Sequence, residues 1–378
     1  GKGIRLENAQ VGSSVAVQTS RIAEFLATGE NVPRMGSATT TTVPHRAFLC
    51  QDKRWLAVGV ITDQQWRGLC KAISTPELLD DQRFATNPGR IKHRDELEDR
   101  LQTILSAKPA RWWTIQLRKH KVPVSLFYDY ETIPDLPQVR ANKYIVNLRY
   151  PGAGTLPFGN IPFQYSKTPV SLKPGPWPGQ DTEQVLKEGW GTDDRVPAKG
   201  YFGPTTPIKN GPLDGITVVD MTQGICGPYA SLLLADAGAR VIKVEPPSGD
   251  SARSYGPFQG DEPHPEKSGL FLYLNLNKLG ITLDVDQVQG VSVFKELVRD
   301  ADILIDANMP EDMESRGLTY EALREINPRL IMVSITPFGQ TGPYRNYKGG
   351  NFIAWHSGGT GYQCPQGYVT QPDREYPL

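Results

Sequence analysis

Residues 212–245 read PLDGITVVDMTQGICGPYASLLLADAGARVIKVE, and the rest of the chain can be interpreted outward from this segment. The apolar, β-branched run 216–220 predicts a buried strand. After a glycine-containing turn, apolar residues recur at helical spacing, at Ala230, Leu233, Leu234 and Ala237. Pro228 suits the first position of that helix, and Gly238 suits its end. A second apolar strand is expected at 241–244. Such a strand–helix–strand unit predicts parallel strands joined by a right-handed crossover.

The turn after the first strand argues against dinucleotide binding, a common use of such a unit. A dinucleotide site needs the pattern G-x-G-x-x-G, whose glycines let the backbone approach the pyrophosphate. Residues 223–228 read QGICGP, so the pattern is absent. An NAD-dependent enzyme with Glu245 on the ribose stays as an alternative. The plainest interpretation is one βαβ unit of an α/β enzyme.

The same segment resembles the opening of the class III CoA-transferase family, the formyl-CoA transferase or carnitine CoA-transferase type. Members of that family open with P-L-x-G-[IV]-x-V-[LV]-D, continue with G-P, and then read L-[AG]-D-[LF]-G-A-x-V-I-K-[VI]-E. The corresponding residues here are Pro212, Leu213, Gly215, Val218, Asp220, Gly227, Pro228, 234–238 and 241–245. Gly249 and Asp250 follow, as in the family's P-x-x-G-D. The resemblance implies a Rossmann-like fold and an enzyme that moves CoA between acids.

The motifs of this family occur in an unusual order along the chain. Residues 1–190 resemble the second half of a family member, and residues 212–378 resemble the first half. Residues 191–211 are rich in Gly, Pro and Thr and have no apolar period, which is typical of a linker. We therefore interpret the chain as the middle of a head-to-tail tandem protein, with further segments expected before Gly1 and after Leu378.

The predicted fold class is α/β, with a Rossmann-like parallel sheet in a large domain and a separate small α+β domain. The large sheet is expected within 216–363. The small domain is predicted from a hairpin at 47–60 that is followed by helical apolar faces. A short helix is expected near 20–27. The expected segments are a connecting arm (1–43), the small domain of the first unit (44–140), its C-terminal return segment (141–190), the linker (191–211) and the N-terminal Rossmann-like part of the second unit (212–378).

Composition and residue spacing argue against several classes of protein. The chain has 378 residues with 41 Lys+Arg and 41 Asp+Glu, and this neutral balance gives no support for nucleic-acid binding. No apolar run is long enough to span a bilayer, and the N-terminal residues do not resemble a signal peptide, so we expect a cytoplasmic protein. The histidines form no H-x-x-x-H pair, and no metal spacing occurs among Cys50, Cys70, Cys226 and Cys364. We therefore expect reduced thiols and no metal site.

The resemblance implies a site for CoA, which enters as an acyl-CoA substrate. CoA is expected at the turn after the first strand, where the N–H groups that begin the helix suit a pyrophosphate. Arg253 is expected to offer its charge to a phosphate. Leu283 matches an adenine-pocket position, and Asn308 lies in the loop that approaches the nucleotide. Gly339 is expected to place its backbone near the thioester carbonyl. The predicted CoA-binding residues are Gln223, Gly224, Ile225, Cys226, Arg253, Leu283, Asn308 and Gly339.

The resemblance also implies the chemistry, but the nucleophile is not assigned. Family members use an aspartate that forms an aspartyl-CoA thioester, so that one difficult transfer becomes several easier steps. In the family this aspartate lies a short way beyond a glycine segment that corresponds here to 357–361. The matching aspartate is therefore expected beyond Leu378. Asp373 is the nearest acid, but it lacks the flanking pattern of the family, and the plainer interpretation is a loop carboxylate.

Other functions stay open beside a CoA-transferase that acts on an acyl-CoA and a small carboxylic acid. The α-methylacyl-CoA racemase branch has a G-H-D segment that aligns with 348–350, so its histidine position is Gly349 here. A degenerate unit that binds acyl-CoA without catalysis is another possibility. The dimethylsulfoniopropionate CoA-transferase/lyase type fits the tandem layout, with Trp355 and Tyr362 available for cation–π attraction to a sulfonium. The expected assembly is an interlocked dimer or an intramolecular pseudo-dimer.

Overall fold

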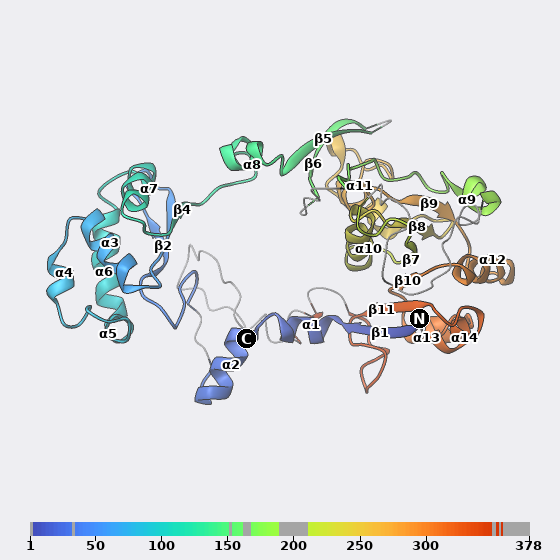
Figure 1. The fold of residues 1–378 in the computed structure, drawn as a ribbon, viewed down its shortest axis with the longest axis horizontal. Helices are drawn as coiled ribbons and strands as arrows, with labels where there is room; N and C mark the ends of the chain where they lie inside the picture. Colours follow the sequence, from blue (N-terminus) through green and yellow to red (C-terminus); the bar gives the residue numbers. More distant parts are fainter. Residues whose placement is uncertain are drawn as a thin grey trace. The chain divides into compact units, whose positions relative to one another are not determined.

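The structure is a computed structural model that describes residues 3–31, 35–150, 153–161, 168–188 and 211–349, together with 353, 354 and 357. It divides into two compact units, whose elements are labelled in Figure 1. The described part of the large unit lies within 3–13 and 135–354, and the small unit contains residues 14–134. The large unit is therefore assembled from two segments that are far apart in the sequence.

A six-stranded parallel sheet forms the centre of the large unit. Its strands lie in the order β1-β11-β10-β7-β8-β9, and each neighbouring pair is parallel. This sheet confirms the predicted fold class, and β7, α10 and β8 confirm the predicted strand–helix–strand unit. Parallel strands place all their carboxyl ends at one edge of a sheet. The strands are β1 (Ile4–Ala9), β7 (Thr217–Met221), β8 (Arg240–Glu245), β9 (Leu279–Thr282), β10 (Ile303–Asp306) and β11 (Ile331–Thr336).

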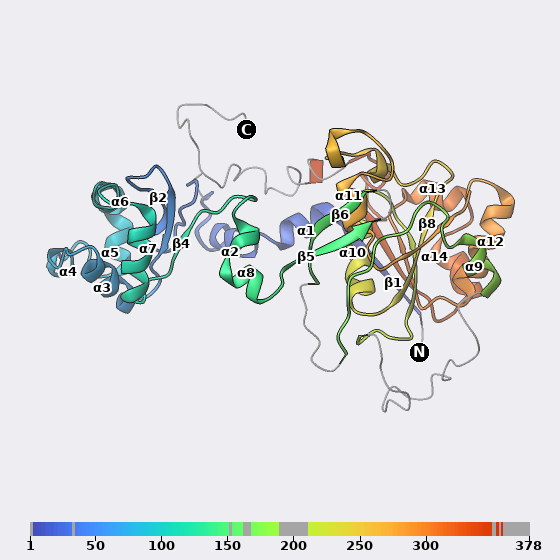
Figure 2. The same cartoon turned by 90° about the horizontal axis from the view of Figure 1, so that it is seen from above.

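Helices cover both faces of the large sheet (Figure 2). On one face, Ala235 of α10 shares a buried core with Val218 of β7. On the other face, Phe294 of α12 shares a core with Val219, the next residue of β7. Successive side chains of a strand point to opposite faces, so β7 is buried on both sides. All five of its residues are buried, including the charged Asp220. The helices are α9 (Thr182–Glu188), α10 (Cys226–Asp236), α12 (Val288–Arg299), α13 (Pro310–Ser315) and α14 (Tyr320–Ile326).

A hairpin and a short helix pack against α10. Tyr150 of the hairpin shares a core with Leu232 of α10 and Leu272 of α11. The Tyr150 hydroxyl donates a hydrogen bond to the Leu272 carbonyl (2.9 Å) and accepts one from the Gly175 amide (2.8 Å). These contacts fix the hairpin to the large unit. The elements are β5 (Ile145–Tyr150) and β6 (Gly154–Gly159), which are antiparallel, and α11 (Gly269–Leu274).

Residues 173–182, within the expected return segment, lie along β9 at one edge of the sheet. The Asp181 amide donates to the Gly280 carbonyl (2.8 Å), and the Asp181 carboxylate accepts from the Gly280 amide (2.7 Å). The Thr182 hydroxyl accepts from the amide of Thr282 (3.1 Å). An edge strand otherwise exposes unpaired backbone groups, so this segment stabilises the β9 edge.

The first residues differ from the expected arm. Residues 4–9 form β1, which pairs with β11 from Ile4 opposite Ile331 to Ala9 opposite Thr336. Its sequence, IRLENA, places charged Arg5 and Glu7 among apolar residues. Helix α1 (Gln10–Ala16) follows, and α2 (Thr19–Thr28) covers the helix that was expected near residues 20–27.

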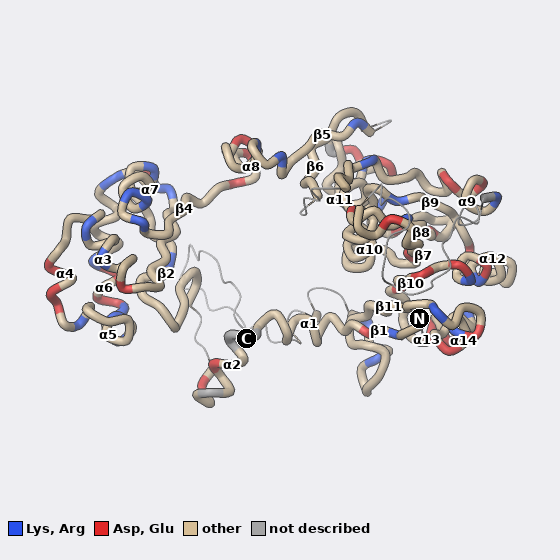
Figure 3. Tube along the Cα trace, in the orientation of Figure 1, with Lys and Arg blue, Asp and Glu red and all other residues tan. Residues whose placement is uncertain are grey.

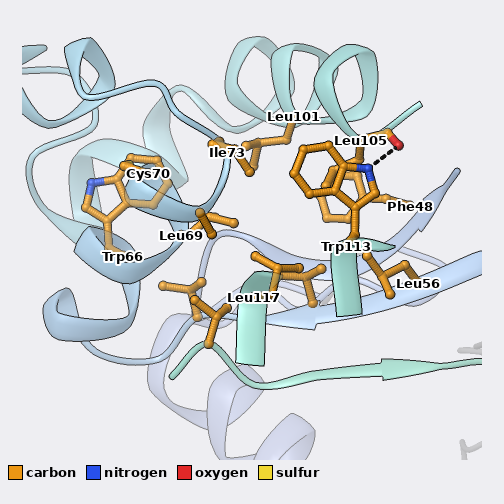
Figure 4. Packing of buried hydrophobic residues seen from close by; sticks show 14 of the residues in the cluster. Phe48, Leu56, Trp66, Leu69, Cys70, Ile73, Leu101, Leu105, Trp113 and Leu117 are labelled. Carbon is orange, nitrogen blue, oxygen red and sulfur yellow. Dashed lines mark hydrogen bonds between the residues drawn. The ribbon is translucent and has the colours of Figure 1, made fainter. Parts of the chain in front are cut away.

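The small unit has its own antiparallel sheet, in the order β2-β3-β4. The predicted hairpin is present as β2 and β3. Figure 4 shows the buried core, in which the Trp113 indole Nε1 donates to the Leu105 carbonyl (2.8 Å). Buried Glu98 pairs with Arg46 (2.7 Å) and Arg94 (3.2 Å). The elements are β2 (His45–Leu49), β3 (Trp55–Gly59), β4 (Val124–Leu126), α3 (Asp63–Ala72), α4 (Glu77–Asp80), α5 (Asn87–Lys92), α6 (Arg94–Leu105) and α7 (Ala110–Lys119).

The remaining short helices are η1 (Ile133–Asp135), α8 (Pro137–Ala141), η2 (Ser251–Ser254) and η3 (Gln259–Asp261). Figure 3 shows Lys and Arg gathered along α7 of the small unit, whereas both signs of charge are interspersed in the large unit. Within the described residues, no helix is both long and apolar enough to cross a membrane.

Candidate functional site

The chain reverses its direction of travel across the large sheet between β7 and β10. From β7 it moves to β8 and β9 on one side, and it then returns to β10 and β11 on the other. Ligands of open α/β sheets bind outside the carboxyl ends of the strands at such a switch point. The Asn308 side-chain amide spans it, because Nδ2 donates to the carbonyl of Met221 at 3.3 Å. Asn308 is thus at the position where a ligand of this fold is expected.

The turn between β7 and α10 is shaped by two glycines. Gly224 has φ +76°, a conformation that favours glycine. A Cβ on Gly227 would come within 2.3 Å of the Cβ of Thr222, so only glycine fits there without a shift. Helix α10 begins at Cys226, two residues earlier than predicted, and Pro228 is its third residue. Proline is tolerated there, because the first four N–H groups of a helix have no partner within it.

Three of the four predicted turn residues present exposed side chains. Ile225 and Cys226 lie at the exposed start of α10. The side chain of Gln223 is oriented by its Oε1, which accepts a hydrogen bond from the Ser251 amide at 3.3 Å. The Cys226 Sγ accepts a hydrogen bond from the Gln10 Nε2 at 3.3 Å. Gln10 comes from the segment after β1, and sequence reasoning did not include it in the site.

Two further predicted residues follow other strands at the same edge of the sheet. Gly339 comes after β11, has φ +87°, and a Cβ on it would lie 3.4 Å from the Cβ of Ala9. Leu283 comes directly after β9, where its amide donates to the Glu245 carbonyl (2.9 Å). Its side chain packs against the buried core that contains Phe294 of α12. The structure therefore brings the turn, Asn308, Gly339 and Leu283 to one edge, whereas their contacts with CoA stay predictions.

Arg253 is buried and paired with carboxylates. Its guanidinium is 4% exposed and lies 3.6 Å from the centre of the Phe271 ring. It donates to both oxygens of Glu245 (2.7 and 2.8 Å) and to Glu266 (3.1 Å). The charge of Arg253 is thus matched by the buried carboxylate of Glu245 and the partly buried carboxylate of Glu266. This pairing does not support the expectation that Arg253 offers its charge to a phosphate, and that role stays a prediction. The same contacts occupy Glu245, which removes the ribose ligand that the NAD alternative requires.

A buried network of charges lies beneath the turn. The Asp220 carboxylate accepts hydrogen bonds from the Thr222 amide (3.0 Å), from the Thr222 and Ser231 hydroxyls, and from Lys278 Nζ (3.0 Å). Lys278 also donates to the carbonyl of Pro228 at 2.9 Å. Hydrogen-bonded pairing of this kind is what allows charges to be buried. The network therefore connects the end of β7 to the first turn of α10.

The pKa values in this network reflect burial and pairing. Burial alone would raise the pKa of Asp220, but Lys278 and Lys243 outweigh that effect and hold it below its ordinary value. Burial lowers the pKa of Lys278 to about 8, against the opposing effect of Asp220. Both groups stay charged near neutral pH, so the pair is an ion pair there.

A second ion pair lies at the same turn, between Lys243 of β8 and Asp250. Lys243 Nζ is 2.6 Å from Asp250 Oδ2, and both side chains are fully buried. Lys243 also donates to the Thr222 carbonyl, and Asp250 Oδ1 accepts from the Gly224 amide (3.0 Å). In the sequence, Lys243 and Asp250 each fall within a segment that resembles a family motif, but neither segment shows that the two side chains pair.

Asp306 is the other buried acid at the switch point. It ends β10, and its carboxylate accepts hydrogen bonds from the Ser334 hydroxyl (2.7 Å) and the Asn308 amide (3.1 Å). Burial raises its pKa to about 6, and these hydrogen bonds oppose the rise only in part. A carboxyl group in this state takes up or loses a proton near neutral pH.

Several predicted residues lie outside the described part of the chain. These are the glycine segment after 357, Trp355, Tyr362 and Asp373. Among the residues that the structure describes, no group of three His, Cys, Asp or Glu side chains could hold a metal ion.

Comparison with known sequences decides the family. The sequence model of CoA-transferase family III matches residues 1–182 and 213–375. This chain belongs to CoA-transferase family III. The two matched segments are separated by 183–212, which overlaps the predicted linker. The turn at the switch point is therefore a turn of a family III protein, in agreement with the resemblance found in the sequence.

Curated relatives of this family III chain match it over part of its length. It is 44% identical over 145 residues to an acetyl-CoA:oxalate CoA-transferase of Acetobacter aceti, covering 38% of this chain and 36% of the relative. It is 39% identical over 175 residues to a succinyl-CoA–L-malate CoA-transferase beta subunit of Chloroflexus aurantiacus, covering 45% and 41%. A CAIB/BAIF family protein from Brucella suis matches with 38% identity and a TM-score of 0.39, over 44% of this chain and 43% of that structure. The chain thus spans less than half the length of these relatives.

Proposed function

We propose that this chain is part of a class III CoA-transferase, an enzyme that moves CoA between an acyl-CoA thioester and a carboxylic acid. The observation that carries this proposal is the family match over both segments of the chain. Relatives with names such as acetyl-CoA:oxalate CoA-transferase support the substrate class, a CoA thioester with a small acid.

In this proposal CoA lies across the carboxyl edge of the large sheet. The pyrophosphate meets the N-terminus of α10, where N–H groups without helical partners and the helix dipole favour an anion. Gln223, Ile225 and Cys226 supply the exposed surface beside it. Leu283 and Asn308 lie toward the nucleotide, and the backbone of Gly339 lies near the thioester carbonyl, where a donor would stabilise a developing oxyanion.

The proposed chemistry proceeds through an aspartate, as the family resemblance implies. Its carboxylate attacks the thioester carbonyl, and the C–S bond breaks to give an aspartyl anhydride and the CoA thiolate. The thiolate then attacks the aspartyl carbonyl, which releases the donor acid and leaves aspartyl-CoA. The acceptor carboxylate collects the CoA by the same two steps in reverse. No described residue is proposed as this aspartate.

The racemase alternative is disfavoured by the site itself. Its histidine position corresponds to Gly349, where a Cβ would lie 2.8 Å from the Cβ of Pro337 and 3.2 Å from the ring of Phe338. A histidine would therefore have to displace the loop after β11. This observation favours the transferase over proton-transfer chemistry.

The tandem arrangement is also proposed. Its support is that β1, from the segment resembling the end of one family unit, pairs along its length with β11, from the segment resembling the start of another. An intramolecular pseudo-dimer or an interlocked dimer would follow. Some relatives are subunits of enzymes with more than one kind of chain. A dimethylsulfoniopropionate transferase and lyase is one candidate for the tandem enzyme, on sequence layout alone.

Two experiments test the function. Calorimetry measures whether the chain binds CoA. A transferase and a non-catalytic acyl-CoA-binding unit should both bind CoA, whereas an NAD-dependent enzyme should not. Mass spectrometry after incubation with an acyl-CoA donor then looks for a covalent product. We expect binding without an acyl or CoA adduct on the described residues. An adduct on Asp373 would identify it as the nucleophile, and absence of any CoA binding would overturn the proposed function.

A further inference from the structure

Two buried side chains form hydrogen bonds with the backbone of the turn that is proposed to bind CoA. The carbonyl of Thr222 accepts a hydrogen bond from Lys243 Nζ, and the amide of Gly224 donates to Asp250 Oδ1 at 3.0 Å. These two groups stand on either side of Gln223. Lys243 Nζ and Asp250 Oδ2 are 2.6 Å apart, so the two attachments are joined through one ion pair.

The attachments come from a different part of the sheet. Lys243 stands in β8, and Asp250 lies five residues after the end of β8, at the start of η2. Asp250 is itself fixed, because its amide donates to Glu245 Oε2 at 2.8 Å and its Oδ1 also accepts from the Ala252 amide at 2.8 Å. The turn after β7 is therefore positioned by residues that follow the neighbouring strand.

The surroundings make this pair rigid. Both side chains are fully buried, with 0% of each exposed to solvent. A side chain in such a position has little rotamer freedom, and a buried charge is retained only while its partner is present. Gly224 also needs a positive φ, which the surrounding structure must hold in place. A carboxylate that accepts its N–H is a direct means of holding it.

We infer that Lys243 and Asp250 are positioning residues for the CoA turn, which fix Thr222 and Gly224 so that Gln223 and the start of α10 face the ligand. The pair does not touch CoA. This inference rests on the proposed function, because the ligand of the turn is taken to be CoA. According to this inference, Asp250 of the Gly-Asp motif at 249–250 acts as a buried support for the turn. It does not act as a surface charge that contacts the ligand.

The test separates positioning from stability. Lys243→Met leaves a buried carboxylate without its partner, and Asp250→Leu leaves a buried ammonium without its partner. The double variant Lys243→Met/Asp250→Leu leaves neither charge behind, and replacement of a whole buried pair by apolar residues is often close to neutral for stability. We expect both single variants to lose thermal stability and the double variant to regain most of it.

Affinity for CoA should rank the variants differently from thermal stability. All three variants lack an attachment of the turn, so we expect each to bind CoA about tenfold more weakly, or about 1.4 kcal/mol, in calorimetry. Pantetheine, which lacks the nucleotide and pyrophosphate, should show little change. Hydrogen exchange at the Gly224 amide should become faster in all three. Asp250→Asn keeps an acceptor for Gly224 and should give an intermediate loss, which keeps the test usable if another variant does not fold.

A matched control is Glu98→Gln, which removes the charge of a buried, paired carboxylate in the small unit. It should lower thermal stability without a change in CoA affinity. If affinity instead follows stability across all variants, and recovers in the double variant, the positioning role is overturned while CoA binding by the wild-type chain still supports the proposed function. If the wild-type chain does not bind CoA, the proposed function fails first, and the inference fails with it.

Discussion

The Nε2 of Gln10 lies 3.3 Å from the Sγ of Cys226, although 216 positions of sequence separate the two residues. The contact joins the first residue of α1, directly after β1, to the first residue of α10. The exposed thiol is therefore held at the carboxyl edge of the sheet, beside the turn that is proposed to bind CoA. This placement makes Cys226 a chemical reporter of the site.

We expect CoA to protect Cys226 from alkylation. The thiolate is the reactive form of cysteine, and burial raises the pKa of Cys50 to about 11 and that of Cys70 to about 12, so both should react slowly. In a Cys364→Ser background, iodoacetamide should modify Cys226 first, and CoA should slow that reaction. The measurement is peptide mass spectrometry over time. Equal rates with and without CoA would place the ligand elsewhere.

A bulky residue at position 227 should disturb the turn. Gly227→Val introduces a Cβ within 2.3 Å of the Cβ of Thr222, and overpacking of this kind costs about 1–3 kcal/mol of stability. We expect CoA affinity in calorimetry to fall about tenfold. The control is Gly12→Ala in α1, where the nearest atom to the added Cβ is 3.8 Å away. Unchanged affinity of Gly227→Val would contradict the assignment of this turn.

Loss of Lys278 should be severely destabilising. Lys278→Met leaves the buried Asp220 carboxylate without the lysine with which it forms an ion pair, and removal of one member of a buried ion pair costs about 3–5 kcal/mol. Urea denaturation followed by circular dichroism measures the loss. The matched control, Lys267→Met, removes a lysine that pairs with the exposed Glu262 and should change stability little. A similar small effect for both variants would mean that the buried pair is not needed for stability.

The buried Asp306 predicts a distinctive dependence of stability on pH. Its folded pKa of about 6 exceeds the ordinary value of an aspartate, so the folded protein binds more protons than the unfolded chain between about pH 4 and 6. Its contribution to stability is therefore lost as pH rises through that window. Asp306→Asn should be more stable than the wild type at about pH 7, on the order of 1–3 kcal/mol. Near pH 4, where the wild-type carboxyl is protonated, the two proteins should be alike.

Much of the central unit could be predicted from sequence because its signals are local. The apolar run of β7, the helical spacing of α10 and the glycine at 238, which has φ +95°, all lie within 34 consecutive residues. Strand β1 could not be predicted in the same way. Its first four residues alternate apolar and charged groups, as an exposed arm also can, and its pairing partner β11 lies at the other end of the described chain.

The place of a candidate residue in the fold could be predicted where it follows from a motif, whereas its contact with CoA stays a prediction. Gln223, Gly224, Ile225, Cys226, Asn308 and Gly339 follow the strands β7, β10 and β11, whose carboxyl ends share one edge. Arg253 was not predictable in this way, because sequence shows a charge but not its burial or its carboxylate partners. Gln10 and the pair of Lys243 and Asp250 depend on contacts across the sheet, which no local pattern specifies.

The pairing of β1 with β11 has a consequence for biosynthesis. Ile4 leaves the ribosome before its partner Ile331 has been translated, and at typical rates of synthesis the delay is roughly 15–65 s. During that time the apolar side chains of Ile4 and Leu6, which are about half exposed even in the finished fold, lack the strand β11 with which they pair in the fold. The nascent chain therefore carries β1 without this partner through the synthesis of the whole small unit, and an unpaired strand edge favours chaperone binding or association with neighbouring nascent chains.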